Sequence, residues 1–373
     1  MDNDTMDYIN ISGCSLENTI HIQTDEAAET FLNSDLAYLL AVAVVPIIIA
    51  LGAFGNIAFF IMLYRLPYMR TTVNLYLASL ATVDLVYVLT VPSIFIYAIV
   101  NSPLSGDFPF PGRYSCATFF FFGYACYYFS IALLTVISFE RYVAICRPIH
   151  HIKTQGRSRT LALISAAGIL SIVLAAVTLP RRGQQVVRCL IWPEGELYLE
   201  FPTTMYSCEP LGNEKVIITF TDIVYVGFFF VALITSGYCY IKIIIALSNR
   251  HSDVADRSSN NPTPQFIAVR NQVTRALVTL GAVYFITQTP IRITDINEVL
   301  EQFGPGFLTK DQAGFIESIG FLFLFFNSAV NSYIYIFCSS FYRRAFVEAF
   351  TGHAGRGSKA SGTPNSSTKQ TKT

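Results

Sequence analysis

Two groups of ionisable residues lie inside or at the edge of long apolar stretches, where a charge is expensive. Glu140, Arg141 and Tyr142 directly follow the run from Cys116 to Phe139, which contains no charged residue. An acid–base pair there is costly unless it works at the boundary with water. Asp84 stands inside another apolar stretch. Near mid-membrane a carboxylate costs about 2.5–3.5 kcal/mol, so Asp84 is a candidate functional residue.

The elements that must position these residues are long apolar helices. The chain has 373 residues, of which 53% are hydrophobic and only 13% charged, whereas soluble domains have about 25% charged residues. A bilayer span needs about 20 mostly apolar residues. The sequence predicts an all-α membrane protein, a bundle of seven transmembrane helices. The predicted spans are 37–63, 74–100, 116–139, 160–180, 217–247, 272–299 and 313–338.

The distribution of basic residues orients the bundle. Residues 1–36 contain no lysine or arginine, whereas the loops after the first and third predicted spans are basic. The positive-inside rule therefore places the N-terminus outside and the C-terminus in the cytosol. The segment 181–216 carries basic residues against this rule, but it also carries acids, and the other loops decide.

Composition also excludes several function classes. The net charge is zero, which gives no electrostatic case for a nucleic-acid partner. All five histidines lie outside the predicted spans, so they build no metal cluster within the membrane. A membrane-embedded hydrolase needs facing acids or histidines, and Asp84 has no such companion. The sequence therefore predicts a protein that is not an enzyme.

Four cysteines lie on the predicted outer side, where disulfides form. Cys116 opens the third span, Cys189 and Cys208 lie in the long outer loop, and Cys14 lies in the outer tail. A bridge can tie that loop to the third helix. The favoured pairing is Cys116–Cys208, with Cys14–Cys189 second, and the connectivity of Cys14 and Cys189 stays open.

The chain divides into three regions. Residues 1–36 form an acidic outer tail that is short of a core, with glycosylation sequons at Asn3 and Asn10. Residues 37–350 form the membrane domain, which ends in a short amphipathic eighth helix lying against the lipid head groups. Residues 351–373 form a cytosolic tail whose composition predicts disorder. Its serines and threonines are candidate phosphorylation sites that would dock an arrestin-type partner.

The long outer loop between Pro180 and the fifth span is large enough for a β-hairpin lid. Its predicted strands are Val186–Ile191 and Met205–Cys208. The acidic outer tail beside such a lid would steer a basic peptide inward.

Several short motifs follow one another in an order that resembles the rhodopsin-like family of G-protein-coupled receptors, and the neuropeptide branch in character. The resemblance covers roughly residues 37–350. Each motif alone is weak, but their spacings together are specific. The motifs are Gly55-Asn56, Leu77-Ala78-Ser79-Leu80-Ala81-Thr82-Val83-Asp84, Glu140-Arg141-Tyr142, Pro290 and Asn331-Ser332-Tyr333-Ile334-Tyr335. The chain departs from the family pattern at Ala232, Gln288 and Ser332, where the family has proline, tryptophan and proline.

The resemblance implies coupling to a heterotrimeric G protein at the cytosolic ends of the helices. Glu140 would hold Arg141 at rest through a charge-assisted bond, and Arg141 and Tyr335 would re-pair in the active state. The implied coupling residues are Glu140, Arg141, Tyr142, Tyr240, Asn331 and Tyr335.

Many relatives add an acid at the base of the sixth helix, whereas this chain has Arg270 and Arg275 there. We therefore expect raised basal activity. The alternative is that Tyr240 and Tyr335 hold the inactive state by other bonds.

The resemblance also supplies neighbours for Asp84. Carboxylate, hydroxyl and amide oxygens suit a hard cation, so we interpret the group as an allosteric sodium site that stabilises the resting state. The alternative is a buried polar network with water and no ion. The predicted sodium ligands are Asp84, Ser130, Asn327, Ser328 and Asn331. No other cofactor or metal is expected.

The residues in the outer halves of the spans predict a ligand pocket. This pocket has neither the aspartate of amine receptors nor the lysine that binds retinal. Gly123 stands where amine receptors have an aspartate, and Phe325 stands near the position of a retinal-binding lysine. The guanidinium of Arg292 suits a carboxylate or a peptide carbonyl; alternatively it pairs with Asp295 or Glu317. The predicted pocket residues are Tyr124, Tyr127, Gln288, Arg292, Asp295 and Glu317.

The sequence thus predicts a multi-pass plasma-membrane receptor with its N-terminus outside. Its expected partners are an extracellular, neuropeptide-like peptide, a heterotrimeric G protein, an arrestin-type protein and membrane lipid. Two alternatives stay open. One is a receptor of the same fold for a lipid or a nucleotide. The other is a small seven-helix transporter, although the sequence shows no internal repeat.

Overall fold

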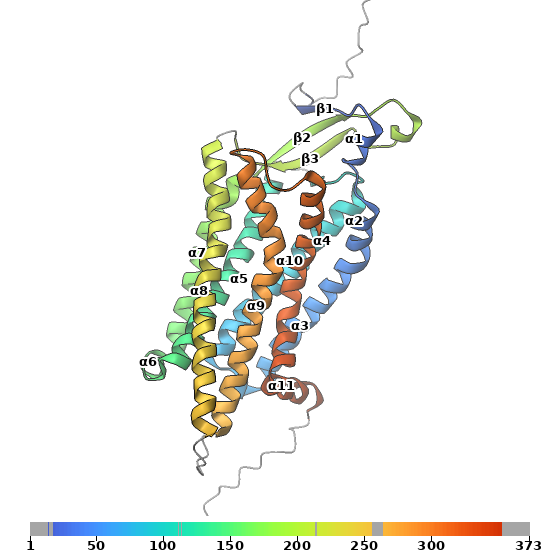
Figure 1. Cartoon of the computed structure of the whole chain (residues 1–373). Coiled ribbons are helices and arrows are strands. Elements are labelled where there is room, and N and C mark those ends of the chain that lie inside the picture. Colours follow the sequence, from blue (N-terminus) through green and yellow to red (C-terminus); the bar gives the residue numbers. More distant parts are fainter. Residues whose placement is uncertain are drawn as a thin grey trace, which may run out of the picture.

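A computed structural model describes residues 14, 18–110, 112, 114–212, 215–255 and 264–352. Over these residues, seven helical segments are long and apolar enough to cross a membrane, which confirms the predicted bundle. The first span runs through α2 (Asp35–Leu39), η2 (Leu40–Val44) and α3 (Val45–Arg65). The other six are α4 (Thr72–Asn101), α5 (Ser115–Cys146), α7 (Arg157–Thr178), α8 (Lys215–Ala255), α9 (Pro264–Glu301) and α10 (Lys310–Cys338). Figure 1 shows them side by side in one bundle.

Several helices extend beyond the stretches that hydropathy marks. α8 continues from the predicted end at 247 to Ala255, and α9 begins at Pro264. The stretch between the fifth and sixth predicted spans, 248–271, is therefore helical at both of its ends, and residues 256–263 lie outside the described part. Hydropathy marks only the portion of a helix that meets lipid. The helix itself continues into water as long as its backbone hydrogen bonds are formed.

Local sequence explains how several helices begin. Thr71 caps α4 by accepting a hydrogen bond from the Asn74 amide, and Thr309 and Gln312 form a capping box at α10. Such caps satisfy amides that have no partner within the helix. Pro46, in the first turn of α3, follows the π-helical turn η2. Proline cannot donate to the preceding turn, so a local change of helix type accompanies it.

The outer end carries a three-stranded sheet of order β1–β2–β3. β2 (Gln184–Ile191) and β3 (Thr204–Glu209) pair antiparallel, as the hairpin prediction expected. β1 (Thr19–His21), from the outer tail, adds in parallel to β2 with Thr19 opposite Cys189. Figure 1 places this sheet and the short helix α1 (Asp25–Glu29) together at the outer end of the bundle.

The outer tail has a core of its own, against the sequence-based expectation. Ile22 and Ala28 of the tail are buried against Leu104 and Leu190. We call residues 18–34 the outer cap. The apolar residues of the outer cap are few and irregularly spaced. They form a core only together with apolar residues from the hairpin and from the loop after α4. Asn3 and Asn10 lie outside the described residues, as do all the predicted phosphorylation sites in the cytosolic tail.

Both favoured disulfides are present. Cys116 at the start of α5 bonds Cys208 of β3, with Cα atoms 5.6 Å apart. Cys14 bonds Cys189 of β2, with Cα atoms 5.9 Å apart. The first bridge ties the hairpin to the bundle and the second ties the outer tail to the hairpin.

The predicted eighth helix is α11 (Ser340–Thr351), which lies across the cytosolic end (Figure 1). Tyr342, Ala345 and Ala349 are buried on one face, while Arg343 and Arg344 are exposed. The Tyr342 hydroxyl donates to Asn74 Oδ1 at 2.6 Å. α11 is therefore held to the inner end of α4 by a buried hydrogen bond and by its apolar face.

Candidate functional site

A cavity of about 1050 Å³ lies among the outer halves of α4, α5, α9 and α10. Five of the six predicted pocket residues line it: Tyr124, Tyr127, Gln288, Arg292 and Glu317. Asp295, the sixth, is not among the lining residues and instead belongs to an ion-pair network behind the cavity wall. The outer cap contributes Leu32 and Asn33 to the lining, a contribution that the sequence did not reveal.

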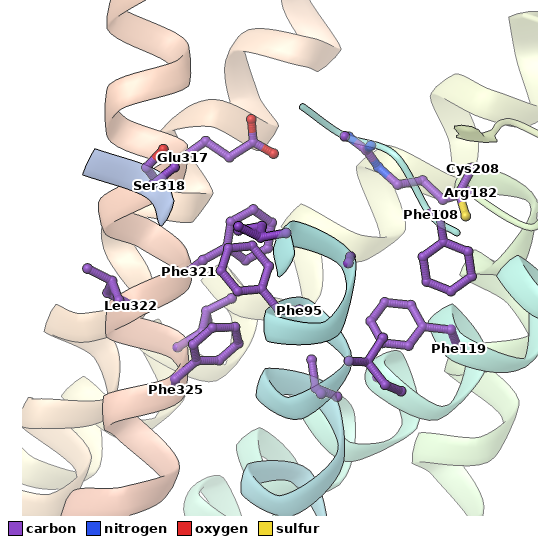
Figure 2. A pocket seen from close by; sticks show the side chains of 18 of the residues that line it. Phe95, Phe108, Phe119, Arg182, Cys208, Glu317, Ser318, Phe321, Leu322 and Phe325 are labelled. Atoms are coloured by element: carbon purple, nitrogen blue, oxygen red, sulfur yellow. The ribbon is translucent and has the colours of Figure 1, made fainter. Parts of the chain in front are cut away.

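Phenylalanine rings form much of the cavity wall. Phe95 of α4 packs against Phe321 and Phe325 of α10, with ring centroids 6.0 and 5.6 Å apart. Figure 2 shows Phe108 and Phe119 across the cavity from this group. These walls were not among the predicted pocket residues, although Phe321 and Phe325 stand four residues apart and so share one face of a helix.

Arg181 forms the centre of the ion-pair network at the outer end. It lies in η4 (Leu179–Arg181), the turn that follows α7. Its guanidinium contacts Asp222 of α8 at 2.5 Å and, from α9, Asp295 at 2.7 Å and Glu298 at 2.8 Å. Arg182 adds a second bond to Glu298 at 2.8 Å. A buried arginine with several carboxylate partners fixes the helices that carry them.

Arg292 joins this network from the cavity side. Its Nη1 lies 3.0 Å from Asp295 Oδ2, and its Nη2 donates to the Tyr225 hydroxyl at 2.9 Å. Its guanidinium also lies 4.9 Å from the ring centroid of Tyr127, a favourable cation–π contact. Of the two partners predicted for Arg292, the structure gives Asp295.

The inner part of the cavity contains polar atoms without partners in the described part of the chain. They include Gln288 Oε1, Arg292 Nε and the hydroxyls of Tyr124, Tyr127 and Tyr284. Buried polar atoms are nearly always paired, so the orphans mark places where a ligand or water completes the bonding. Gln288 replaces the family's tryptophan, and it puts an amide where that residue would put a ring.

The Asp84 group lies beside the inner end of the cavity. Asn331 Nδ2 donates to Asp84 Oδ2 at 2.6 Å, and Asn327 Nδ2 donates to the Thr287 hydroxyl at 2.6 Å. Ser130, Asn327 and Ser328 line the cavity itself. Asp84 is 1% exposed, so its carboxylate depends on these neighbours. The donor set of carboxylate, hydroxyl and amide oxygens fits a hard cation.

Glu140 has a partner that the sequence did not predict. Arg159, in the first turn of α7, donates to Glu140 Oε1 at 2.7 Å and to Oε2 at 3.4 Å. The resemblance implied that Glu140 holds Arg141, and that role stays a prediction; the structure adds Arg159 as a partner of Glu140. Arg141 is buried in the same region. No sequence signal identified Arg159, because the pair is formed by the packing of α5 on α7.

Three other predicted coupling residues, Tyr240, Tyr335 and Tyr142, contact neighbours other than Arg141. The Ser138 hydroxyl donates to the Tyr240 hydroxyl at 2.6 Å, and a β-carbon at Gly281 of α9 would overlap that tyrosine. Tyr335 is buried with its ring 5.6 Å from Phe59. Tyr142 packs against Tyr238, with ring centroids 6.1 Å apart.

Comparison with known proteins gives one family and several relatives. The sequence model described as "7 transmembrane receptor (rhodopsin family)" matches residues 55–335. The cholecystokinin receptor of Xenopus laevis is 25% identical, covering 85% of this chain and 78% of that receptor. Neuromedin-U receptor 2 of Mus musculus is 27% identical over 84% of this chain and 75% of its own. The motilin receptor of Homo sapiens is 32% identical over a shorter part, 36% of this chain and 31% of its own.

Proposed function

The chain belongs to the rhodopsin family of seven-transmembrane receptors, and from that premise we propose that it binds an extracellular peptide and promotes guanine-nucleotide exchange on a heterotrimeric G protein. The protein resides in the plasma membrane, where its family acts. The family is one of receptors, not of enzymes. Peptide binding and G-protein coupling are the two steps that this proposal adds.

The continuity between the cavity and the Asp84 group is the observation that carries the proposal. Ser130 and Asn327 line the cavity and also belong to the predicted sodium set. Asn331, one helical turn further inward on α10, bonds Asp84 of α4 at 2.6 Å. A ligand that moves the outer half of α10 therefore acts on the same helix that carries Asn331 and Tyr335.

The mechanism is a shift between helix packings. A ligand changes such an equilibrium only by the difference in its affinity for the two states. A sodium ion held by Asp84, Ser130, Asn327, Ser328 and Asn331 would supply a charge that favours the resting packing. Ligand binding would favour the packing in which α9 moves away from α5 at the cytosolic end. Arg141 and Tyr335 would then re-pair and face the G protein.

Three observations support a peptide as the ligand. The relatives in the comparison include receptors named for cholecystokinin, motilin and neuromedin-U. The cavity volume of about 1050 Å³ is at the upper end of the range for small-molecule sites. Its lining combines phenylalanine rings with polar atoms that lack a partner among the described residues, which are the Gln288 Oε1, the Tyr127 hydroxyl and the Arg292 Nε. Such groups suit the side chains and backbone of a peptide end.

The test is nucleotide exchange with the full chain in nanodiscs on a panel of purified G proteins. Exchange is measured without ligand and then with a library of amidated peptides, for the wild type and for Arg141→Ala. We expect at least one peptide to accelerate exchange in the wild type and none to do so in Arg141→Ala. A wild type that binds peptides without accelerating exchange on any G protein would contradict coupling.

A lipid ligand is the second candidate, because the outer cap covers the cavity and supplies Leu32 to a mostly apolar wall. The same assay separates the two ligand classes. If lipid extracts stimulate exchange and no peptide does, the proposed ligand becomes a lipid. The proposed coupling to a G protein is unaffected by that outcome. Docking of an arrestin-type protein to the phosphorylated tail remains a prediction on residues outside the described part.

A further inference from the structure

Glu317 is an acid of the cavity wall that lies outside the neighbouring ion-pair network. That network contains three arginines and three acids, which are Arg181, Arg182, Arg292, Asp222, Asp295 and Glu298. Its formal charges therefore cancel. Glu317 lines the cavity from α10 and belongs to none of these pairs. An ionisable residue inside a membrane bundle is a functional candidate whose partner must be identified.

Within the described part of the chain, no basic group lies within ion-pair distance of the Glu317 carboxylate. Arg182 faces it across the mouth of the cavity (Figure 2), but its guanidinium is already bonded to Glu298 at 2.8 Å. Lys310 stands seven residues earlier on α10, which places its Cα about 10 Å further outward. A negative charge thus faces a cavity that is large enough to admit a ligand.

Aromatic rings lie directly below this charge. Phe321 and Phe325 follow Glu317 by four and eight residues on α10, so they lie about 6 and 12 Å deeper along the helix. Figure 2 shows Glu317 above these rings, on the same side of the cavity. An extended chain advances by about 3.3–3.6 Å per residue, so this depth corresponds to two to four residues of a peptide.

The inner wall supplies a second, independent sign of a ligand. Gln288 is 5% exposed and lines the cavity, and its Oε1 atom has no partner among the described residues. The Arg292 Nε and the Tyr127 hydroxyl lack partners in the same region. A backbone or terminal amide, which both donates and accepts, satisfies an acceptor and a donor of this kind together.

From these observations we infer that Glu317 selects ligands that carry a cation, a lysine or arginine side chain or an amino terminus, two to four residues from an aromatic or large apolar group. The cation binds at Glu317 and the apolar group packs among Phe95, Phe321 and Phe325. This inference rests on the proposed ligand-binding role of the cavity. It adds the charge and the spacing of the ligand, and it makes Glu317 the specificity-determining residue.

The first test measures the charge preference of the cavity without any receptor activity. Gly123 lines the cavity, and a β-carbon there meets no atom within 4 Å, so Gly123→Cys provides a thiol reporter. The free cysteines Cys126, Cys146, Cys239 and Cys338 are replaced by alanine. The reaction rates of this thiol with trimethylammonium-ethyl and sulfonatoethyl methanethiosulfonate are compared with Glu317 present and with Glu317→Gln.

We expect the ratio of cationic to anionic reaction rates to fall by about tenfold in Glu317→Gln, because a charged cleft with apolar walls concentrates its counter-ion. The control is Glu301→Gln, an acid at the outer end of α9 that does not line the cavity; it should leave the ratio unchanged. An unchanged ratio in Glu317→Gln, with thermal unfolding showing intact folding, overturns the inference.

The second test measures ligand selection directly. Two pools of heptapeptides both end in phenylalaninamide. One pool carries lysine three residues before this end, and the other carries norleucine there. Each pool is made with a free and with an acetylated amino terminus. Retention on immobilised receptor in nanodiscs should favour the lysine pool by about tenfold, and Glu317→Gln should abolish that preference. A preference that depends on the free amino terminus assigns the cation to that group.

Equal retention of both pools by the wild type overturns the inference. A charge preference in the first test with no peptide retained would mean that the peptide proposal, not the role of Glu317, has failed.

Discussion

Glu140 forms an ion pair with Arg159 of α7, with a shortest distance of 2.7 Å between the charged atoms. This pair affects the stability of the resting state of the receptor. A carboxylate engaged by Arg159 is less available to Arg141, the neighbouring residue that the family uses for coupling. The hypothesis of raised basal activity gains a physical basis here, because the pair competes with the resting bond. The Glu140 side chain is 6% exposed and that of Arg159 34%, so the competition takes place at the edge of the bundle.

Replacing Arg159 should therefore lower basal activity. In Arg159→Ala we expect ligand-independent exchange to fall by up to about fivefold, because a partly exposed pair contributes about 1 kcal/mol or less. Arg159→Lys should retain most of the exchange. The matched control is Arg157→Ala, an exposed arginine at the start of the same helix. Basal exchange equal to that of the wild type in Arg159→Ala would show that this pair does not set the resting state.

A second prediction at the scale of residues concerns Asp84 and the effect of sodium on basal exchange. Wild-type basal exchange should decrease when sodium replaces potassium at constant ionic strength, since a sodium ion bound by the Asp84 group favours the resting packing. Asp84→Asn removes the charge while keeping a similar shape, so its exchange should be insensitive to the replacement. The measurement is exchange in nanodiscs at matched salt concentrations. An identical sodium response in both proteins would rule out the Asp84 group as the sodium site.

Sequence reasoning reached some residues of the site and not others for a clear reason. Motifs of fixed spacing located Asp84, Arg141 and Asn331, because the family preserves their types. Arg159 and Arg181 were counted only as loop charges, since nothing local marks the carboxylates they meet. Those carboxylates come from helices far away in the chain, and only packing brings them together.

At the scale of elements, the close approach of α8 and α9 depends on one glycine. The Tyr240 hydroxyl, which bonds Ser138, lies against the backbone of Gly281, where a β-carbon would overlap it. Gly281→Ala should displace Tyr240, break the bond to Ser138 and destabilise the bundle by about 1–3 kcal/mol. Thermal unfolding and basal exchange measure the two effects. Gly237→Ala on α8, where a β-carbon meets no atom within 4 Å, is the matched control. A Gly281→Ala variant as stable as this control would contradict the predicted overlap.

The outer cap should be a separate unit of stability. Among the described strands β1 pairs with β2 alone, and Cys14 bonds Cys189, so Cys14→Ser removes the covalent tie between tail and hairpin. We expect hydrogen exchange of the backbone amides of β1 to accelerate by at least about tenfold, because a small surface unit opens locally at low free energy. The unfolding temperature of the bundle should stay the same. Unchanged protection of β1 in Cys14→Ser would show that packing alone holds the cap.

The elements were predictable to the extent that they meet lipid. Apolar length located all seven spans, because the bilayer imposes a minimum length, and amphipathic spacing located the helix α11. The hairpin was predicted from the length of the outer loop. β1 was missed because three residues of strand become stable only when β2 provides the partner. The extension of α8 was missed because its last turns are polar.

At the scale of the whole molecule, the structure joins an outer ligand cavity to an inner coupling region through one polar group. The cavity reaches Ser130 and Asn327, and Asp84 and Asn331 lie next to them. The outer ion-pair network fixes α7, α8 and α9 at their outer ends, so movement of α9 is expected at its cytosolic end. The sequence predicted both ends of this path, but not the phenylalanine walls or the cap that enclose its entrance.

The most direct test of this account is ligand-stimulated exchange after the cavity is filled. Gly123→Trp places a large side chain in the cavity from a position where a β-carbon meets no atom within 4 Å, and Ile234→Trp on the exposed, lipid-facing side of α8 is the control. Exchange is measured with the amidated-peptide library and with lipid extracts. We predict that stimulation is lost in Gly123→Trp, while basal exchange remains and Ile234→Trp behaves as the wild type. Equal stimulation in wild type and Gly123→Trp, or no stimulation of the wild type by either source, would contradict the claim that signalling begins in this cavity.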